Sequence, residues 1–282
     1  MATLPFVKMH GLGNDFVVVD ARADAAPITP DLARAIADRH RGVGFDQLIV
    51  IEPPKDKAAD VFFRFYNSDG SEAGACGNGT RCVAQRVMAE RGADHLAIET
   101  IAGALEATRR PDGRVTVDMG PARLDWRDIP LAEACDTGAV PVELGPLSRP
   151  VATSMGNPHA TFFVADLASI DLAALGPKLE HHRMFPERAN IGVAQILSPE
   201  RMRLRVWERG AGITLACGSG ACAAGVAAVR RKLIAGRKVA IVVDGSTPGD
   251  PASEIEIEWL RDGHVLMTGP TALSFTGAWP LA

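Results

Sequence analysis

The chain of 282 residues lacks the features that mark membrane, secreted or nucleic-acid-binding proteins. No apolar run approaches the roughly 18–20 residues of a membrane-spanning helix. Residues 1–8 lack the charged and apolar regions of a signal peptide. The net charge is −4 and is spread along the chain, whereas binding to nucleic acid usually needs a basic patch. We therefore expect a cytoplasmic protein with neither a membrane nor a nucleic acid as its partner.

Cysteine is scarce, and its pattern argues against both disulfides and metal. The chain has 5 cysteines, an odd number in a sequence whose 47% apolar residues can build a core without staples, so reduced thiols are the simplest interpretation. The spacings from Cys76 to Cys82 and from Cys217 to Cys222 are unusual for zinc, and no paired histidines complete such a site. We expect no bound metal, and we expect Cys82, Cys135 and Cys222 to be small buried apolar residues.

Signatures of nucleotide binding are also missing. No Gly-x-x-x-x-Gly-Lys-Ser/Thr segment occurs in the sequence. Gly11-Leu12-Gly13 precedes a predicted strand rather than following one, so the dinucleotide-binding order of strand, glycine-rich turn and helix is not reproduced. The sequence therefore predicts no nucleotide cofactor.

Short β-strands dominate what the sequence does contain. Runs rich in β-branched and aromatic residues predict strands at 16–20, 47–51, 61–66, 114–119, 161–164, 202–208, 239–244, 254–260 and 264–268. Thr29 and Pro30 predict the start of a helix, as its cap and its first helical residue. The proline-rich stretch 121–150 has little periodicity, and we expect the crossover between two halves of the chain near its start.

Two further helices each follow a cysteine and a glycine-rich turn. Residues 76–79 read Cys-Gly-Asn-Gly and precede a predicted helix at 80–90, and residues 217–220 read Cys-Gly-Ser-Gly and precede a predicted helix at 221–234. The second helix places Leu233 on an apolar side and has so little charge in its first half that we expect it to be buried. A sheet wrapped around a buried helix, once in each half, is the α+β architecture that these patterns favour.

The two cysteine turns belong to a longer internal repeat. Cys76 and Cys217 are 217 − 76 = 141 residues apart, which is half of the chain. Other polar residues recur at nearly the same offset: Asn14 with Asn157, Gln47 with Asn190, and Asn67 with Glu208. Chance would rarely keep these positions in register, so we infer a duplicated fold with a site at its pseudo-twofold axis.

A cysteine that opens a helix can supply both a reactive thiol and an anion-binding site. The glycines that follow Cys76 and Cys217 let the backbone approach a ligand closely, and the first N–H groups of each helix point toward it. Such a terminus binds carboxylates and can lower the pKa of a thiol from about 8.5 to roughly 3.5–7.5. Two facing thiols could take a proton from one side of a molecule and return it from the other.

The polar residues near these turns have both structural and functional explanations. Taken singly, the repeated Asn residues fit turns or caps, but as a repeated set they favour a ligand site. His159 is either a satisfied histidine or a group that tunes a nearby thiol. Glu208 and Arg209 are either a solvated pair or the partners of the ammonium and carboxylate groups of a zwitterion.

Motifs spread over nearly the whole chain carry a family resemblance. They are His10–Phe16, Gly44–Gln47, Tyr66–Ser71, Cys76–Cys82, Ser154–His159, Asn190–Gly192, Glu208–Gly212 and Ala216–Cys222. In this order they resemble the diaminopimelate epimerase family, and Met267–Pro270 looks like the family's returning C-terminal strand. The resemblance implies two pseudo-symmetric domains, 1–119 with 267–282 and 120–266. Each would be a mostly antiparallel, barrel-like sheet around a central helix, with the active site in the cleft between them.

The resemblance also implies a reaction, the interconversion of LL- and meso-2,6-diaminopimelate in lysine and peptidoglycan-precursor biosynthesis, with no cofactor. Cys76 and Cys217 would be the catalytic pair, and His159 and Glu208 would adjust the thiol pKa values. The residues implied in substrate binding are Asn14, Gln47, Asn67, Gly77, Asn78, Asn157, Asn190, Glu208, Arg209, Gly218 and Ser219. A homodimer that takes a small-molecule substrate is the implied assembly.

Two other functions remain open at this stage. A two-cysteine racemase for proline or hydroxyproline would share the thiol pair, but proline has no second amino-acid end for the polar residues to bind. A redox or ligand-binding protein could use Cys76 and Cys217 as a switchable disulfide, although the absence of C-x-x-C argues against dedicated oxidoreductase chemistry.

Overall fold

The computed structural model describes residues 2–23 and 27–281, which form two compact units. Unit 1 comprises Met1–Val117 and Gly269–Ala282, and unit 2 comprises Asp118–Thr268. The boundaries expected from the sequence, after residues 119 and 266, lie a few residues from these. The N-terminal unit is therefore discontinuous, because the end of the chain returns to it.

Unit 1 is a mixed sheet with two helices. Its elements are β1 (Thr3–Gly11), β2 (Asn14–Asp20), α1 (Pro30–Ala37), β3 (Gln47–Glu52), β4 (Val61–Asn67), β5 (Glu72–Ala73), α2 (Gly77–Arg91), β6 (His95–Thr100), β7 (Gly103–Arg109), β8 (Val115–Pro121, which crosses the unit boundary) and β19 (Ala272–Pro280). β1 is antiparallel to β2 and β19, β3 is antiparallel to β4, and β6 is antiparallel to β7. β2–β3 and β4–β6 are parallel pairs.

Unit 2 repeats this order of elements. It contains β9 (Glu143–Leu144), β10 (Leu147–Ser148), β11 (Val151–Ser154), β12 (Pro158–Phe163), η1 (Leu167–Ser169), α3 (Leu172–Glu180), β13 (Asn190–Ser198), β14 (Arg201–Glu208), β15 (Gly212–Thr214), α4 (Gly218–Arg230), β16 (Lys238–Val242), η2 (Pro251–Ser253), β17 (Ile255–Trp259) and β18 (His264–Gly269). β12–β13 and β14–β16 are parallel, and β11–β12, β13–β14, β16–β17 and β17–β18 are antiparallel.

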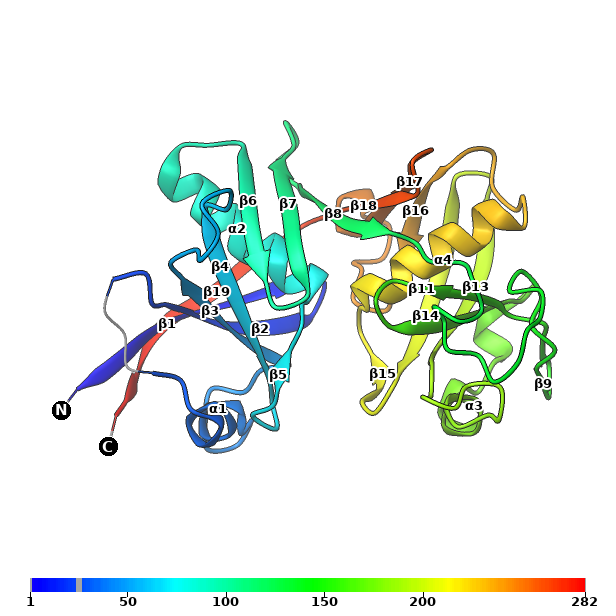
Figure 1. The fold of residues 1–282 in the computed structure, drawn as a ribbon, viewed down its shortest axis with the longest axis horizontal. Helices are drawn as coiled ribbons and strands as arrows, with labels where there is room; N and C mark the ends of the chain where they lie inside the picture. The colour runs from blue at the N-terminus through cyan, green and yellow to red at the C-terminus, as the bar shows by residue number, and fades with distance from the viewer. Residues whose placement is uncertain (1, 24–26, 282) are drawn as a thin grey trace. The chain divides into compact units, whose positions relative to one another are not determined.

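The strand register confirms the internal duplication. Phe16 lies opposite Gln47 in unit 1, and His159 lies opposite Asn190 in unit 2. Both pairs differ by the same offset, 159 − 16 = 143 and 190 − 47 = 143. In each unit a short strand then leads into a cysteine and a central helix, α2 or α4, which Figure 1 shows among the strands of its own unit. The expected α+β class with two domains is confirmed.

The core of unit 1 explains why its strands are apolar on both sides. Val17, Leu48 and Ile36 belong to a cluster that packs α1 against one face of β2 and β3. On the other face, Phe16 and Ile49 lie against Gly79 in the first turn of α2. Because both faces of this parallel pair are covered, the strands read as continuous apolar runs rather than alternating ones.

The segment 121–150, expected to be weakly structured, contributes to the core of unit 2. Val140, Val142 and Leu147 are fully buried in that core. Two arginines at the end of α4 bind carbonyls of this segment: Arg230 Nη1 donates to Thr137 O at 3.4 Å, and Arg231 Nε donates to Gly138 O at 3.1 Å. Arg230 Nη1 also donates to Ala152 O in β11 at 3.0 Å. The two guanidinium groups thus tie this segment to the end of α4.

The helix ends differ from those expected. α2 and α4 begin at Gly77 and Gly218, directly after their cysteines, and α4 ends at Arg230 rather than near residue 234. Lys232 adopts a left-handed φ of 55°, which ends the helical path. Leu233 is consequently 37% exposed, so its predicted place on the buried side of the helix was wrong.

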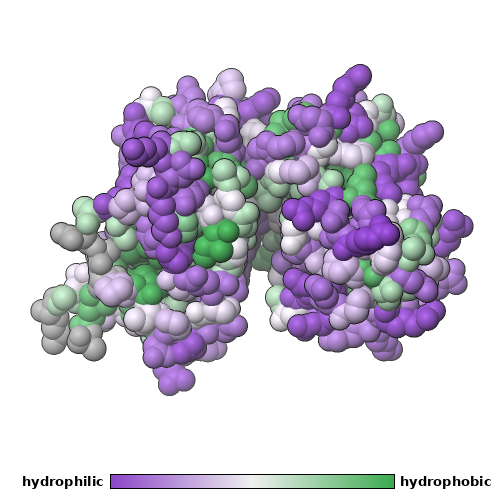
Figure 2. All heavy atoms as spheres, in the orientation of Figure 1, coloured by the Kyte–Doolittle hydropathy of each residue, from purple (hydrophilic) through white to green (hydrophobic). Residues whose placement is uncertain are grey.

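The surface is predominantly polar. On the face shown in Figure 2, hydrophobic residues form small separated areas among polar ones. Among the larger apolar side chains, Leu273 and Phe275 on β19 are 60% and 48% exposed. Within the described residues, no helix has both the length and the apolar character needed to cross a membrane.

Candidate active site

Cys76 stands at the N-cap of α2 in unit 1. Its backbone is extended, with φ −144° and ψ 111°, and its Sγ accepts a hydrogen bond from the N–H of Gly79 at 3.4 Å. A Cβ at position 79 would lie 2.6 Å from Ile49 Cδ1, so a larger residue than Gly79 would force the Ile49 side chain to move. The thiol is partly exposed. An N–H donor and a helix N-terminus both favour the thiolate form of such a cysteine.

Cys217 occupies the equivalent N-cap of α4 in unit 2. Its φ and ψ are −120° and 111°, close to those of Cys76, but its residue is only 5% exposed. Its Sγ lies 3.7 Å from Ser219 Oγ. A Cβ at position 220 would lie 3.2 Å from the sulfur, a tight contact that Gly220 avoids in the third helical position.

The surroundings of Cys217 favour its neutral form. Burial raises the pKa of the Cys217 thiol well above its ordinary value, and the negative charge of Glu208 raises it further. The Gly220 N–H and the Ser219 hydroxyl act in the opposite direction but do not compensate. A helix N-terminus can lower a thiol pKa, but for Cys217 desolvation by burial is the larger effect and the pKa is raised.

Glu208 is fixed at the end of β14. Its Oε1 accepts a hydrogen bond from Thr214 Oγ1 at 2.6 Å, across the β14–β15 pair. The carboxylate is half-buried and acts electrostatically on Cys217. The structure therefore brings Glu208 and Cys217 into one cluster, as their predicted roles require.

His159 reaches the cysteine cluster through other side chains. It is 2% exposed, and its Nε2 lies 2.9 Å from Asn157 Oδ1. Asn157 Nδ2 donates to Ser219 Oγ at 3.4 Å, and Ser219 in turn neighbours Cys217. Burial, together with the positive charge of Arg209, lowers the pKa of His159 to about 3, so the ring is neutral. Because Oδ1 only accepts, Nε2 carries the ring proton.

Asn190 and Arg209 form a second polar group in unit 2. Asn190 is buried; its Nδ2 donates to Pro158 O at 2.9 Å and its Oδ1 accepts from the backbone N–H of Arg209 at 2.9 Å. The exposed Arg209 side chain donates to Glu187 O at 3.0 Å. The described bonds of Asn190 thus hold the backbone of Arg209 in place.

The polar residues predicted in unit 1 form two hydrogen-bonded pairs. Asn78 Nδ2 donates to Asn14 Oδ1 at 3.1 Å, which ties the β1–β2 turn to the first turn of α2. Gln47 Nε2 donates to Asn67 Oδ1 at 3.2 Å, and Asn67 Nδ2 donates to Ser71 Oγ at 3.1 Å. The first pair lies next to the N-terminus of the helix that follows Cys76.

The three remaining cysteines differ in burial. Cys82 and Cys222 are fully buried, as expected, and burial raises the pKa of Cys82 to about 12. Cys135 is only partly buried, which corrects the expectation for that residue. In the described part of the chain, no three or more His, Cys, Asp or Glu side chains are grouped as a metal site would need.

Comparison with known proteins decides the family. The family described as diaminopimelate epimerase matches residues 6–124 and 151–273. The diaminopimelate epimerase of Rhodospirillum centenum is 60% identical over 272 residues, covering 96% of this chain and 91% of that protein. That of Acidiphilium cryptum is 58% identical over 276 residues, covering 98% and 96%. This chain belongs to the diaminopimelate epimerase family.

Solved structures show that the fold of the diaminopimelate epimerase family extends beyond it. A phenazine biosynthesis protein of the PhzF family from Bacillus anthracis gives a TM-score of 0.69 at 16% identity, over 100% of both chains. A hydroxyproline epimerase from Agrobacterium vitis, with trans-4-hydroxy-L-proline bound, gives 0.68 at 14% identity over 98% of this chain and 92% of that one. At these identities the likeness concerns the two-domain fold alone.

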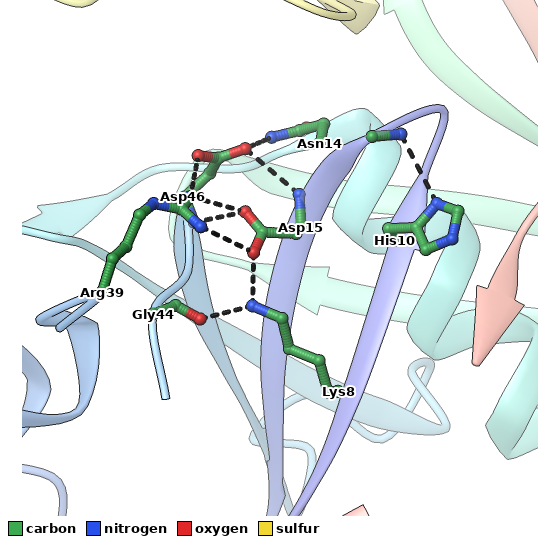
Figure 3. A network of polar contacts seen from close by, with 8 residues as sticks. Lys8, His10, Asn14, Asp15, Arg39, Gly44 and Asp46 are labelled. Atoms are coloured by element: carbon green, nitrogen blue, oxygen red, sulfur yellow. Dashed lines mark hydrogen bonds and ion pairs between the residues drawn. The ribbon is translucent and has the colours of Figure 1, made fainter. Parts of the chain in front are cut away.

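A charged network beside Asn14 was not anticipated from the sequence (Figure 3). Asp15 accepts from Lys8 and from Arg39, whose Nη2 lies 2.8 Å from Asp15 Oδ1 and 2.8 Å from Asp46 Oδ1. Burial raises the pKa of Asp15, but the hydrogen bonds and charges of Arg39 and Lys8 outweigh it and hold the pKa at about 2. The motifs His10–Phe16 and Gly44–Gln47 contain Asn14, Asp15 and Asp46, but nothing in them indicated the bonds to Lys8 and Arg39.

Glu180, on α3, was also not identified from the sequence as a residue near the candidate site. It is 3% exposed, and its carboxylate accepts from Trp207 Nε1 at 2.7 Å and from Gly210 N at 3.0 Å. These bonds clamp the turn that carries Glu208 and Arg209. No local pattern marked Glu180, because its partners are 27 and 30 residues away in sequence.

Proposed function

We propose that this protein is an isomerase that interconverts LL- and meso-2,6-diaminopimelate, in lysine and peptidoglycan-precursor biosynthesis. The observation that carries the proposal is membership of the diaminopimelate epimerase family together with a cysteine at the N-cap of the central helix in each duplicated unit. A duplicated pair of thiols suits a reaction that removes and returns the same kind of proton.

The mechanism that we propose uses Cys76 and Cys217 as a pair of acid–base groups, without a cofactor or metal. The Cys76 thiolate takes the α-proton, the C–H electron pair stays on the α-carbon, and the Cys217 thiol protonates that carbon from the opposite face. In the reverse direction the roles exchange. The low exposure of Cys217 and the neighbouring Glu208 support its assignment as the resting thiol. The two thiols titrate as a coupled pair.

Acid–base catalysis alone is too weak for so poor a carbon acid. General acid–base groups contribute roughly 10²–10⁴-fold. We propose that the first N–H groups of α2 and α4, at Gly77, Asn78, Gly218 and Ser219, bind the α-carboxylate as it becomes enolate-like. Each such donor is worth about 3–4 kcal/mol in comparable sites.

The remaining polar residues are proposed to bind the substrate and to tune the thiols. Asn67, Asn157, Asn190 and Arg209 would hold the distal amino-acid end, and Asn14, Gln47 and Glu208 would complete the site. Binding the non-reacting end positions the reacting carbon. In this scheme Asn190 acts by holding the Arg209 backbone, and His159 acts on Cys217 through Asn157 and Ser219.

We also propose a cellular compartment and an oligomeric state for the enzyme. Chemistry that needs reduced thiols fits the cytoplasm. We propose a homodimer formed through β19, since this strand exposes Leu273 and Phe275 and so offers apolar surface to a second copy.

Incubation with LL-diaminopimelate in D2O tests the reaction. We expect deuterium at the α-carbon of the meso product, with purified protein free of pyridoxal phosphate and added metal. Cys76→Ala and Cys217→Ala should each abolish epimerisation, whereas Cys135→Ala, a thiol outside the proposed site, should retain it. Full turnover by either of the first two variants contradicts the two-thiol scheme.

A parallel incubation with trans-4-hydroxy-L-proline separates the main alternative. The likeness of the fold to a hydroxyproline epimerase makes this the relevant competitor. We expect no isotope incorporation into it, because hydroxyproline has no distal amino-acid end for the polar residues of either unit. Preferential turnover of hydroxyproline would replace the proposed substrate.

A further inference from the structure

Two equivalent asparagines are held with opposite polarity in the two units. Asn14 and Asn157 are related by the repeat, 157 − 14 = 143, and each has a neighbour in the first turn of its central helix, Asn78 or Ser219. In unit 1 the oxygen of the amide, Asn14 Oδ1, faces the helix and accepts from Asn78 Nδ2 at 3.1 Å. In unit 2 the nitrogen, Asn157 Nδ2, faces the helix and donates to Ser219 Oγ at 3.4 Å.

The group on the other side of each amide accounts for this difference. Asn14 Nδ2 donates to Asp46 Oδ2 at 2.7 Å, and an ionised carboxylate can only accept (Figure 3). Asn157 Oδ1 instead faces Nε2 of the neutral His159 at 2.9 Å. Asp46 thus orients the Asn14 amide in unit 1 as His159 orients the Asn157 amide in unit 2. The difference is that Asp46 accepts a hydrogen bond from its amide, whereas His159 donates one.

Asp46 is itself held in a defined orientation. Its Oδ1 accepts from Arg39 Nη2 at 2.8 Å, and its Oδ2 accepts from the backbone N–H of Asp15 at 3.1 Å as well as from Asn14. Arg39 also binds Asp15, which is anchored by the buried Lys8. The side chain of Asp46 is 44% exposed, so its constraint comes from these bonds and not from packing.

We propose that Asp46 is a positioning residue that fixes the polarity of the Asn14 amide and thereby the donor that Asn14 presents to the substrate. This inference rests on the proposed function, in which Asn14 contacts diaminopimelate. Rotation of the amide by 180° would place Oδ1 against the Asp46 carboxylate and Nδ2 against the Asn78 amide nitrogen, so both bonds would become repulsive. Asp46 therefore acts through Asn14 and not on the reacting carbon.

Steady-state kinetics with Asp46→Asn tests this role. The variant keeps the shape of the side chain but can donate as well as accept, so the Asn14 amide is free to rotate. We expect KM for LL-diaminopimelate to rise about tenfold with kcat within about threefold, because an interaction made equally in the bound and transition states is lost. Asp46→Glu keeps a carboxylate that can only accept, so its KM should lie between those of the wild type and Asp46→Asn. Asp38→Asn is the matched control and should behave as wild type. The partly exposed Asp38 carboxylate accepts from the backbone of His40 and Arg41 and pairs with the Arg41 side chain, in the turn after α1.

A double-mutant cycle shows whether Asp46 acts through Asn14. In an Asn14→Ala background, Asp46→Asn should change KM by less than about twofold, because the partner that it orients is gone. Equal effects in both backgrounds, or a wild-type KM for Asp46→Asn alone, would overturn the proposal. A KM change that merely follows a fall in melting temperature would overturn it as well.

Side-chain amide NMR makes the test independent of turnover. The Asn14 NH2 signals, assigned by their loss in Asn14→Ala, should move and exchange faster with solvent in Asp46→Asn but not in Asp38→Asn. Unchanged signals refute the positioning role even if the enzyme is active. The wild-type protein could fail to epimerise diaminopimelate while the NMR signals respond as expected. That result would reject the proposed substrate but would support the role of Asp46 in orienting the Asn14 amide.

Discussion

At the scale of single residues, the two thiols are alike in backbone and different in surroundings. Both cysteines cap a helix with nearly the same dihedral angles, and both are followed by glycine in the third helical position. Cys76 is partly exposed, whereas Cys217 is buried beside the Glu208 carboxylate. In the proposed mechanism this difference favours Cys217 as the thiol that is protonated at rest, because burial and Glu208 both raise its pKa.

Replacing Glu208 with Gln should lower the pKa of Cys217. The carboxylate repels the thiolate, so a neutral amide of the same shape removes a cause that raises the pKa and leaves burial as the main one. We expect the pH midpoint for alkylation of Cys217 by iodoacetamide, followed by peptide mass analysis, to fall. Glu200→Gln, an exposed residue before β14, should not change it. A midpoint that stays or rises contradicts this assignment.

At the scale of elements, packing explains why α2 and α4 start earlier than the sequence predicted. Gly-Asn-Gly and Gly-Ser-Gly have low helix propensity, so the predicted helices began after them. In the structure these residues already form the first turn, because Gly79 and Gly220 leave room for Ile49 and Val206, and tertiary packing overrides propensity. The N–H groups of the turn are thereby placed beside the thiol.

Gly225 in α4 gives a direct test of this packing. A Cβ there would lie 2.6 Å from Ile257 Cγ2, so the helix approaches β17 too closely for any side chain. Alanine gains about 1 kcal/mol of helix propensity over glycine, but overpacking costs about 1–3 kcal/mol, and we expect Gly225→Ala to lower the free energy of unfolding. Urea denaturation should show this loss of stability. A Cβ built at Gly236 meets no atom within 4 Å, so Gly236→Ala should leave the free energy of unfolding nearly unchanged. A more stable Gly225→Ala protein would rule out this account.

At the scale of the whole molecule, the two units share their backbone plan and differ in some of their polar side chains. The paired strands, the central helices and the capping cysteines repeat with an offset near half the chain. Some polar side chains repeat, such as Asn14 with Asn157, but others differ: Asn67 corresponds to Glu208, and Asn78 corresponds to Ser219. Equivalent thiols suit a reversible inversion, and unequal neighbours suit a substrate with one reacting and one bound end.

The proposed dimer is tested by a charge on β19. We expect the wild-type protein to sediment as a dimer and Phe275→Asp to dissociate at concentrations at least about tenfold higher, because a buried unpaired carboxylate opposes association. Leu197→Asp, at an apolar residue of similar exposure on unit 2, is the matched control: Leu197 is 44% and Phe275 48% exposed. Identical sedimentation of all three proteins would exclude this surface.

The parts of the site that were predictable depend on short-range spacing. Glycine turns and the repeat offset are visible in short stretches of sequence, and they correctly predicted the two central helices and the cysteines before them. Apolar runs predicted strands such as β3 and β4, but β1, β6, β7, β13 and β19 were not predicted. The buried carboxylate of Glu180 and the network of Lys8, Asp15 and Arg39 were not predictable, because their bonds join residues that are distant in sequence and leave no periodic pattern.

The sequence by itself determined where the two thiols stand, because a cysteine before a glycine-rich helix start is a local arrangement. Only the tertiary structure decided the surroundings of each thiol. The burial of Cys217 and the polarity of the Asn14 amide depend on which distant groups pack beside them: Asp46 is 32 residues from Asn14 in the chain, and Asn78 is 64. Burial and charge act through space, so the environment that tunes each thiol follows from the fold and not from the motif that carries it.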